Sequence, residues 1–524
     1  MLKKNRIKLN ILLILLSIIF TGNIIVYCEE EKDNPVFKLP EEIIMGSEKE
    51  KKKSEGKEEI RVEEKYGLKK SSYEKIIPDI LLREREENII RAQKRRGSRS
   101  NLDFSLGNFK SINFGINHGR NTGKFNYFLE FDKKTGNRTR SDSDFDYNMF
   151  AGELFAEKID FMMKVNSNKF DLPGGINAPV SGSTRRCDDF GLNFGVKISK
   201  NLYFILKGEN TNLKEGATLK NESLNLKIIY DFIKNNGQYI FTGEVEENKL
   251  ENNYDYSFYS FYMENRGIHL NEKSQAKLGA GVSREGDGKL FLNPSLRYYY
   301  RHSNITNFEA GLKRQNKKVE FYDLYGQNNF SQVNPAPLKR INYWQLYSNA
   351  YMKFSKDLLI NAKIFHDWIE NFVVFDEDDN NPDGLWIPVN IKSVQRDGAQ
   401  VSLIRKFTSD ITAKLYGKLL SSRNENNNQT VPRQYNSISV LIKYRNPLYI
   451  LSIDGKYYGE SYYDKETNEK LGGYFLLGCL LEKSVSEKLL FYAKAGNILN
   501  KKYEIIKHYP GEQTKILLGC KYSF

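Results

Sequence analysis

The feature that most constrains the fold is an alternation of apolar and polar residues, which recurs from Asn101 to the end of the chain. The final stretch, residues 515–524, shows it most clearly. Its apolar positions are Ile516, Leu518, Cys520, Tyr522 and Phe524. Side chains of a β-strand point alternately to its two faces, so this stretch is a strand with one apolar and one polar face. Such a strand suits a soluble sheet or a transmembrane barrel, in which the apolar face meets lipid.

The same period of two defines a series of segments joined by turns and loops. We expect strands at 101–107, 110–119, 122–132, 144–155, 158–169, 188–199, 201–211, 219–232, 237–248, 253–265, 273–284, 288–302, 304–315, 341–354, 357–375, 388–407, 409–421, 434–444, 447–459, 472–484, 487–497 and 513–524. This series has no repeat of fixed length, which a soluble solenoid would show. The predicted fold is all-β: a transmembrane antiparallel up-and-down β-barrel of about 22 strands, an even number as bacterial single-chain barrels have.

Composition agrees with a barrel and disfavours two other classes. The mean hydropathy is −0.60, yet aromatic residues make up 13% of the chain. Aromatic residues scattered through a polar chain suit alternating strands and aromatic girdles better than a bundle of membrane helices. The net charge of +14 comes from Lys and Arg spread along the strands, so we expect a wet lumen and charged loops and no nucleic acid partner.

The amino terminus has the layout of an export signal. Basic residues up to Lys8 precede an apolar run from Leu9 to Phe20. We interpret residues 1–28 as a secretory signal peptide, with an uncleaved membrane anchor as the alternative. An exported barrel belongs in the cell outer membrane, with outer-membrane lipid as its surroundings.

Residues 29–100 differ from the rest of the chain. Positive and negative charges are mixed throughout, as in the run from Glu48 to Lys53. Such a segment buries too little apolar surface to fold, so we expect a mostly disordered periplasmic segment, with a possible helix at 73–96 that Pro78 interrupts. The barrel is predicted to occupy 101–524.

Two motifs carry a family resemblance. The first runs from Gly496 through Asn497-Ile498-Leu499-Asn500-Lys501-Lys502-Tyr503 to Tyr509-Pro510-Gly511 and the final strand. The second joins Phe321-Tyr322-Asp323-Leu324-Tyr325-Gly326 to Asn334-Pro335-Ala336-Pro337-Leu338-Lys339. Together they resemble the second half of the barrel of TonB-dependent outer-membrane receptors. The first motif lacks the family's second Pro and its Arg, because Glu512 follows Gly511.

The resemblance implies a receptor or transport barrel that binds or moves a solute without chemistry. The alternative is a passive porin, or a structural or adhesive barrel, without energy coupling. The family also implies a plug domain of more than a hundred residues, and the short charged segment before residue 101 contains no recognisable plug. A barrel of this width has a lumen that needs plugging, so either something else obstructs it or the pore is large. As obstructions we consider residues 73–96, the loop at 171–187 and a partner protein.

The resemblance also suggests two partner-binding segments. Glu42, Ile43, Ile44, Met45 and Gly46 look like the TonB box, a short β-prone segment that pairs with a periplasmic energy transducer. Leu518, Cys520, Tyr522 and Phe524 resemble the terminal signal that the barrel-assembly machinery reads.

No pattern in the sequence indicates catalysis, a metal site or a cofactor. The five histidines are not at metal-ligand spacing, and no nucleophile is matched with a base and an acid, so we expect no enzyme. We interpret the acidic loop at 376–383 as a solvated tip rather than a Ca²⁺ site. The three tryptophans, Trp344, Trp368 and Trp386, are expected to be interface anchors. Cys479 and Cys520 are expected to be lipid-facing or buried. We expect no disulfide between them, because one strand lies between the two strands that carry them.

Overall fold

We describe a computed structural model of the chain, which places residues 99–122, 125–137, 144–172, 184–199, 201–215, 217–234, 237–250, 254–271, 273–303, 305–319, 324–325, 338–355, 357–377, 386–424, 436–462 and 470–524. The predicted signal peptide, the charged segment up to residue 98 and the TonB-box-like residues Glu42 to Gly46 lie outside these residues. Among the residues described, no helix is long and apolar enough to cross a membrane.

The elements are almost entirely strands, with one helical turn at residues 324–325. In chain order they are β1 (Arg99–Gly107), β2 (Ser111–Asn121), β3 (Phe125–Asn137), β4 (Asp144–Ala156), β5 (Ile159–Asp171), β6 (Thr184–Lys197), β7 (Leu202–Glu215), β8 (Ala217–Lys234), β9 (Gly237–Leu250), β10 (Tyr254–Asn271), β11 (Ser274–Glu285), β12 (Leu290–Leu292), β13 (Ser295–Arg301), β14 (Thr306–Lys317), β15 (Ile341–Ser355), β16 (Leu358–Glu377), β17 (Trp386–Lys406), β18 (Ile411–Asn424), β19 (Ser437–Arg445), β20 (Tyr449–Tyr458), β21 (Ser461–Tyr462), β22 (Lys470–Leu471), β23 (Tyr474–Ser484), β24 (Leu489–Gly496), β25 (Glu504–Ile506), β26 (Tyr509–Pro510) and β27 (Lys515–Ser523).

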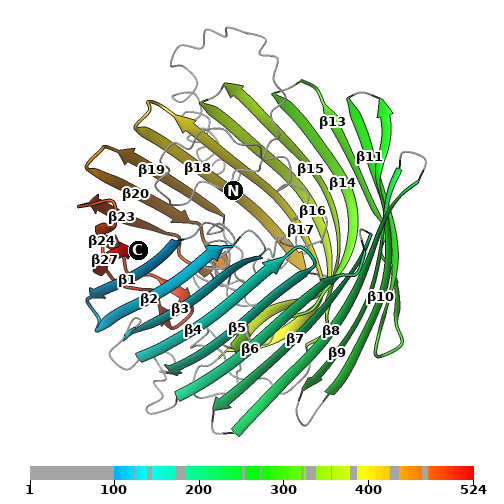
Figure 1. Ribbon diagram of the computed structural model, residues 1–524, viewed down its shortest axis with the longest axis horizontal. Helices are drawn as coiled ribbons and strands as arrows, with labels where there is room; N and C mark the ends of the chain where they lie inside the picture. The colour runs from blue at the N-terminus through cyan, green and yellow to red at the C-terminus, as the bar shows by residue number, and fades with distance from the viewer. Residues whose placement is uncertain are drawn as a thin grey trace. The chain divides into compact units, whose positions relative to one another are not determined.

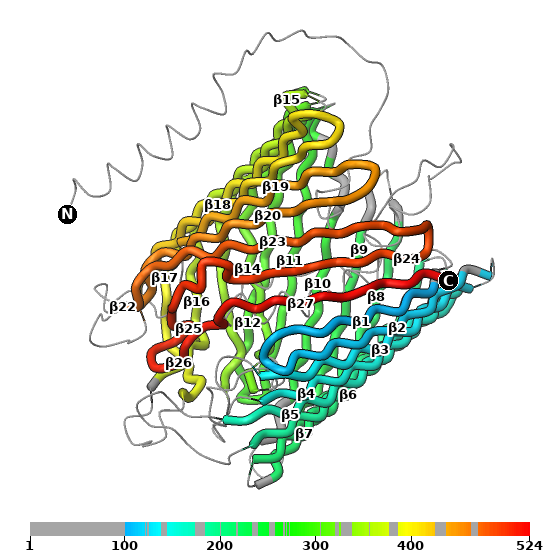
Figure 2. The backbone as a smooth tube through the Cα atoms, turned by 90° about the vertical axis from the view of Figure 1, so that its left-hand side faces the viewer, coloured from blue at the N-terminus to red at the C-terminus, as the bar shows by residue number. Residues whose placement is uncertain are grey.

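The strands form a closed antiparallel barrel in which each strand pairs with its neighbours in sequence (Figure 1). β12 and β13 both pair with β11 and form one strand interrupted at Asn293 and Pro294, so the wall has 22 strands. Pro294 has no backbone N–H to donate, which explains the break. The final strand β27 lies between β24 and β1, and closes the ring through pairs such as Leu106 with Leu518 (Figure 2). The predicted all-β, up-and-down barrel is therefore confirmed.

The predicted alternation separates the two faces of the wall. On the closing strands, Leu106 and Leu518 point outward and are 49% and 61% exposed, while Ser105 points into the lumen and is buried. Apolar side chains that a soluble protein would bury thus form the outer surface, where lipid solvates them. Cys479 on β23 and Cys520 on β27 are free and belong to this outward face, with β24 between their strands, as predicted.

The two ends of the barrel differ in the length of their connections. At the end that holds Ser100 and Phe524, the strands are joined by short turns such as 157–158 and 446–448. The opposite end carries the long connections at 172–183, 318–340, 425–436, 459–473 and 497–514. Outer-membrane barrels have short periplasmic turns and longer extracellular loops, so the long-loop end is the extracellular one.

Two small hairpins stand outside the barrel wall, in the connections at the long-loop end. β21 pairs with β22, and β25 pairs with β26. The alternation of the sequence predicts neither hairpin, because strands of two or three residues are too short to show a period.

Candidate functional site: an apolar cap at the extracellular end

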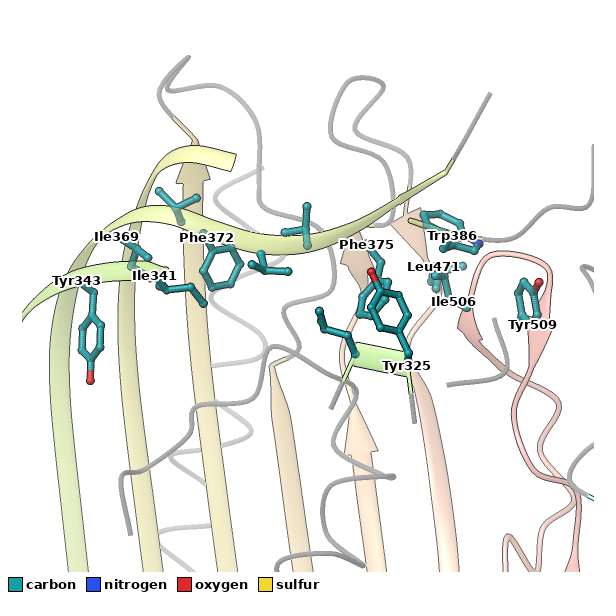
Figure 3. Close-up of a cluster of buried hydrophobic side chains, with 14 of the residues drawn as sticks. Tyr325, Ile341, Tyr343, Ile369, Phe372, Phe375, Trp386, Leu471, Ile506 and Tyr509 are labelled. Carbon is teal, nitrogen blue, oxygen red and sulfur yellow. The ribbon is translucent and has the colours of Figure 1, made fainter. Parts of the chain in front are cut away.

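A cluster of buried side chains joins distant parts of the wall at the long-loop end (Figure 3). We call this cluster the cap. Its members are Cys187, Leu213, Leu324, Tyr325, Ile341, Tyr343, Ile369, Phe372, Val373, Val374, Phe375, Trp386, Val394, Leu471, Ile506 and Tyr509. β6 and β16 are nine positions apart around the 22-strand ring, counting β12 and β13 as one. Side chains from such distant strands share one cluster only if chain segments extend across the lumen, so the cap spans part of its mouth.

The end of the β16–β17 hairpin supplies the largest part of the cap. Beyond Ile369 the alternation stops, and Phe372, Val373, Val374 and Phe375 are all buried. A strand that buries both of its faces is covered on both sides, unlike the lipid-facing wall below it. Figure 3 shows this extension passing over the neighbouring strands, with Phe375 near Tyr325 and Trp386.

The extension begins at Asn371, which has a left-handed backbone conformation with φ of 56°. Asparagine adopts this conformation at lower cost than most residues other than glycine. Its side-chain Nδ2 donates to the Arg340 carbonyl at 3.2 Å, and its own carbonyl accepts from Asn390 Nδ2 at 2.8 Å. These bonds fix the position at which β16 leaves the wall.

A second cap segment, the β14–β15 connection, is held by a buried arginine of the facing wall. Arg185 of β6 is fully buried, and its Nε and Nη2 donate to Glu215 Oε2 at 2.8 and 2.5 Å. Its Nη1 lies 3.4 Å from the carbonyl oxygen of Tyr325. The guanidinium also lies over the rings of Phe170 and Tyr325, 5.8 and 6.0 Å from the centroids. Since an unpaired buried charge is costly, Glu215 is needed to keep Arg185 in this place.

Both ends of the β14–β15 connection are tied to one carboxylate of the wall. Glu246 of β9 accepts a charge-assisted bond from Arg340, at the end of the connection. Lys318, at its start, lies 3.0 Å from Glu246 Oε1. The Arg340 guanidinium also stacks on Phe258, 3.8 Å from the ring centroid. Glu246 and Arg340 are each 7% exposed, so water screens the attraction between their charges only weakly.

Further ion pairs line the lumen. Arg396 Nη2 and Nε lie 2.5 and 2.9 Å from Asp367 Oδ2, and Gln345 donates to the other oxygen of that carboxylate at 2.8 Å. A few strands away around the ring, Arg297 of β13 pairs with Glu264 of β10 at 2.6 Å. Arginines and carboxylates therefore form part of the lumen lining. No group of three or more His, Cys, Asp or Glu in the described part of the chain is arranged to hold a metal ion.

The structure distributes the predicted site residues unevenly. Leu518, Cys520, Tyr522 and Phe524 lie on the outward face of β27, as the alternation requires; their role in assembly stays a prediction. In the loop at 171–187, which was considered as an obstruction, Leu172, Arg185 and Cys187 are buried. Residues 173–183 of this loop lie outside the described residues. Residues 73–96 also lie outside them.

One tryptophan does not occupy its predicted place. Trp368 is 41% exposed on the outer wall, opposite Trp344 on the neighbouring strand, as expected of interface anchors. Trp386 is only 1% exposed and packs inside the cap, so its prediction as an interface anchor was wrong. Trp386 is the first residue of β17 and follows the acidic loop at 376–383. It is buried because its hairpin extends across the lumen.

The cap itself was missed by the sequence analysis. One signal was present: the run Phe372-Val373-Val374-Phe375 breaks the alternation of its strand. Four successive apolar residues at the loop end of a barrel strand indicate a segment covered on both faces.

Solved structures with the same architecture are outer-membrane receptors and transporters. The siderophore receptor PirA from Acinetobacter baumannii matches with a TM-score of 0.63 at 12% identity, over 81% of this chain and 80% of that one. The copper transporter OprC matches with a TM-score of 0.63 at 11% identity, over 82% and 80%. The ferric enterobactin receptor PfeA from Pseudomonas aeruginosa matches with a TM-score of 0.63 at 13% identity, over 82% and 81%.

These matches confirm the predicted resemblance to TonB-dependent receptors at the level of the barrel fold. The closed barrel with its apolar outer surface agrees with the predicted outer-membrane location. No protein-family model matches the chain, and no curated protein matches its sequence.

Proposed function

We propose that the chain is an outer-membrane receptor of the TonB-dependent type that binds a solute at its extracellular end and admits it through the lumen without a chemical step. The observation that carries this proposal is the cap, a packed apolar cluster built from connections of the barrel itself. A permanently open porin has no need of a buried cluster across its mouth. A barrel of this width needs an obstruction, and in this proposal the cap is part of it.

The binding surface in this proposal is formed by the cap and the polar lining below it. A ligand that contacts the cap shifts its equilibrium only if it binds the open form more tightly than the closed one. The solutes named for the similar structures, siderophores and copper, mark the classes to be tried first. Thermal stabilisation of the purified protein by ferric siderophores or copper salts is a direct screen, because a ligand that binds only the folded state raises the Tm.

Energy coupling is the finer part of the proposal, and residues 42–46 are the candidate for it. A segment with the β-prone residues Ile43, Ile44 and Met45 can add a strand to a periplasmic transducer. Pull-down of the periplasmic domain of a TonB-type transducer by the full-length protein, and its loss on deleting residues 39–46, would support coupling. Equal capture by the deleted protein would rule out this segment as the coupling box.

Conductance separates the receptor from the passive porin. We expect the purified protein in planar bilayers to be closed for most of the recording. Large, steady channels without any partner would overturn the receptor proposal and favour a porin.

A further inference from the structure

The barrel wall is interrupted between β12 and β14. β13 pairs with β14 up to its first residue, and one further bond runs from the Arg314 N–H to the Pro294 carbonyl at 3.0 Å. In an antiparallel ladder two residues placed in this way exchange two bonds, but Pro294 has no N–H to donate in return. Beyond this point β12 pairs with β11 alone, whereas β14 continues to its end beside β15. We call this interruption, between residues 290–294 and 314–317, the seam.

The seam leaves peptide groups of both strands without a ladder partner. The Asn293 N–H donates to the Gly281 carbonyl at 2.7 Å, so the peptide groups of Asn293 face β11. Those of successive residues face opposite sides of a strand, so Leu290 and Leu292 direct theirs toward β14. By the same rule Asn316 directs its own toward β12. All residues of the seam are among those described, and no backbone bond joins β12 to β14 there.

Two side chains of β14 bridge the seam where the ladder is missing. Arg314 Nη1 donates to the Leu292 carbonyl at 3.3 Å, and its guanidinium lies 5.2 Å from the centroid of the Phe291 ring. Asn316 Nδ2 donates to Glu285 Oε1 of β11 at 2.7 Å. Two side-chain bonds replace a continuous series of backbone bonds, so the two edges of the seam separate at a lower cost than two strands joined by a ladder.

The seam begins within the membrane-spanning part of the wall. Pro294 lies seven residues from Arg301, the last residue of β13, which is next to a short turn. Seven residues of a strand tilted as in membrane barrels rise roughly 17 Å, which is below the top of an apolar band about 25 Å tall. Leu290 and Leu292 are 70% and 68% exposed. Lipid therefore reaches the outer edge of the seam, and this edge is apolar.

The inner edge of the seam is polar. Ser283 and Glu285 of β11 are buried, and Asn293 Nδ2 donates to Ser283 Oγ at 2.9 Å. Asn316 Oδ1 accepts from Arg340 Nη1 at 3.4 Å, at the end of the β14–β15 connection. The seam thus has an apolar side toward lipid and a polar side toward the lumen, and it contacts the connection that enters the cap.

We propose that the seam is a lateral passage between the lumen and the membrane, through which a single-chain amphiphile crosses the wall. Its acyl chain matches the apolar outer edge at Leu290 and Leu292, and its polar head matches Glu285 and Asn316 on the inner edge. Where the ladder is intact, separating two strands breaks many backbone bonds; here it breaks the side-chain bonds of Arg314 and Asn316. This passage adds a second route to the one proposed above and does not depend on it.

The test uses the full-length protein in phospholipid vesicles that contain palmitic acid with a diazirine group near its carboxyl end. After illumination, mass spectrometry of the digested protein locates the label residue by residue. In the natural protein we expect label at the outer edge, on Leu290 and Leu292. We also expect label on the lumen side, on Glu285 and on Gln315, which contacts the cap.

Two variants should move the lumen label in opposite directions. Pro294→Val supplies the missing N–H to the Arg314 carbonyl and should lower the lumen label about tenfold, with the outer label unchanged. A tenfold change corresponds to about 1.4 kcal/mol, which one backbone hydrogen bond can contribute. Arg314→Leu removes the bond to the Leu292 carbonyl and should raise the lumen label several-fold. A general loss of folding cannot produce both changes.

Matched controls change the same residue types elsewhere. Pro447→Val alters a proline of a short turn, and Arg423→Leu removes an exposed arginine of β18. Both should keep the lumen label of the natural protein. Equal lumen label in P294V and the natural protein would overturn the proposal, because the probe would then enter by another route. Absence of lumen label from the natural protein would overturn it too. The conductance of P294V should equal that of the natural protein, so the two proposals fail separately.

Discussion

Arg185 of β6 and Tyr325 of the β14–β15 connection are 140 residues apart in sequence, yet Arg185 Nη1 lies 3.4 Å from the Tyr325 carbonyl oxygen. The arginine belongs to the wall and the tyrosine to a segment of the cap. Substituting Arg185→Met removes this bond and leaves Glu215 without its partner, so the cap should open more often. We expect longer and more frequent openings in planar bilayers. The control Arg186→Met changes the exposed neighbour on the same strand and should leave the openings unchanged; a closed R185M barrel would show that this contact does not hold the cap.

The left-handed backbone conformation of Asn371 can be tested with two substitutions at this position, one to valine and one to glycine. Asn371→Val places a β-branched residue at φ of 56°, which costs about 1–2 kcal/mol, and also removes the side-chain hydrogen bond to the Arg340 carbonyl. Asn371→Gly removes the same hydrogen bond and permits the conformation. The valine variant should therefore be cut by protease at the cap faster than the glycine variant, and the glycine variant faster than the natural protein. Equal rates for valine and glycine would mean that backbone conformation here is unimportant.

Glu246 and Glu247 provide a matched pair of substitutions. Glu246→Gln leaves Arg340 buried without its counter-charge, for which we expect a loss of about 3–5 kcal/mol in the stability of the folded barrel. Glu247→Gln removes the same charge from the exposed outer face and should change the stability by less than about 0.5 kcal/mol. The measurement is the temperature at which the barrel unfolds in detergent, compared at equal protein concentration. Similar temperatures for the two variants would contradict the role given to Glu246.

A native cysteine allows a direct test of barrel closure. Phe104 of β1 lies directly opposite Cys520 of β27. The Phe524 N–H donates to the Ser100 carbonyl, and hydrogen-bonded pairs recur at every second residue of an antiparallel ladder, so Phe104 and Cys520 also form such a pair. Such pairs have Cα atoms about 5.5 Å apart, within the range of a disulfide. Phe104→Cys should form a disulfide with Cys520 on mild oxidation, seen as a shift on a non-reducing gel after cleavage between the two strands. The control Phe114→Cys, one strand further away on the same face, should not cross-link.

Removal of Phe524 tests the predicted assembly signal. Its N–H donates to the Ser100 carbonyl at 2.9 Å, and its ring is exposed on the outer face. Deleting this residue should lower the amount of barrel in the membrane by several-fold. Phe491→Ala, which shortens an exposed outward aromatic on β24, controls for the loss of a ring. Normal membrane levels of the truncated chain would count against the signal.

Much of the barrel wall was predictable because its period of two is local. Each of the 22 predicted strands corresponds to one strand of the wall, counting β12 and β13 together. β6 starts at Thr184 and not at 188 as predicted, because Arg185 and Cys187 continue its inward face. Most residues before 188 are polar, so the sequence shows no apolar and polar alternation there. The cap was not predictable in the same way. Its contacts join residues of β6, β16 and the segment before β27, and no periodicity within one segment specifies which other segment it meets.

The burial of Trp386 shows the same limit. A tryptophan near the end of a barrel strand is usually an interface anchor, since its ring and N–H suit the border between lipid and water. Here β16 leaves the wall at Asn371, and Trp386 pairs with Glu377 beyond that point in the same hairpin. Trp386 therefore never meets that border. The part of the hairpin beyond Asn371, from Phe372 to Ile391, therefore lies in a different environment from the strands of the wall.

The presence of Ile506 and Tyr509 in the cap has a consequence for the order of assembly. Both residues belong to the hairpin between β24 and β27, and are added only when the last part of the chain is in place. A barrel that lacks its final hairpin therefore lacks part of its own obstruction. Completion of the wall and packing of the cap therefore depend on the same last segment, and neither can be finished before the final residues of the chain are in place.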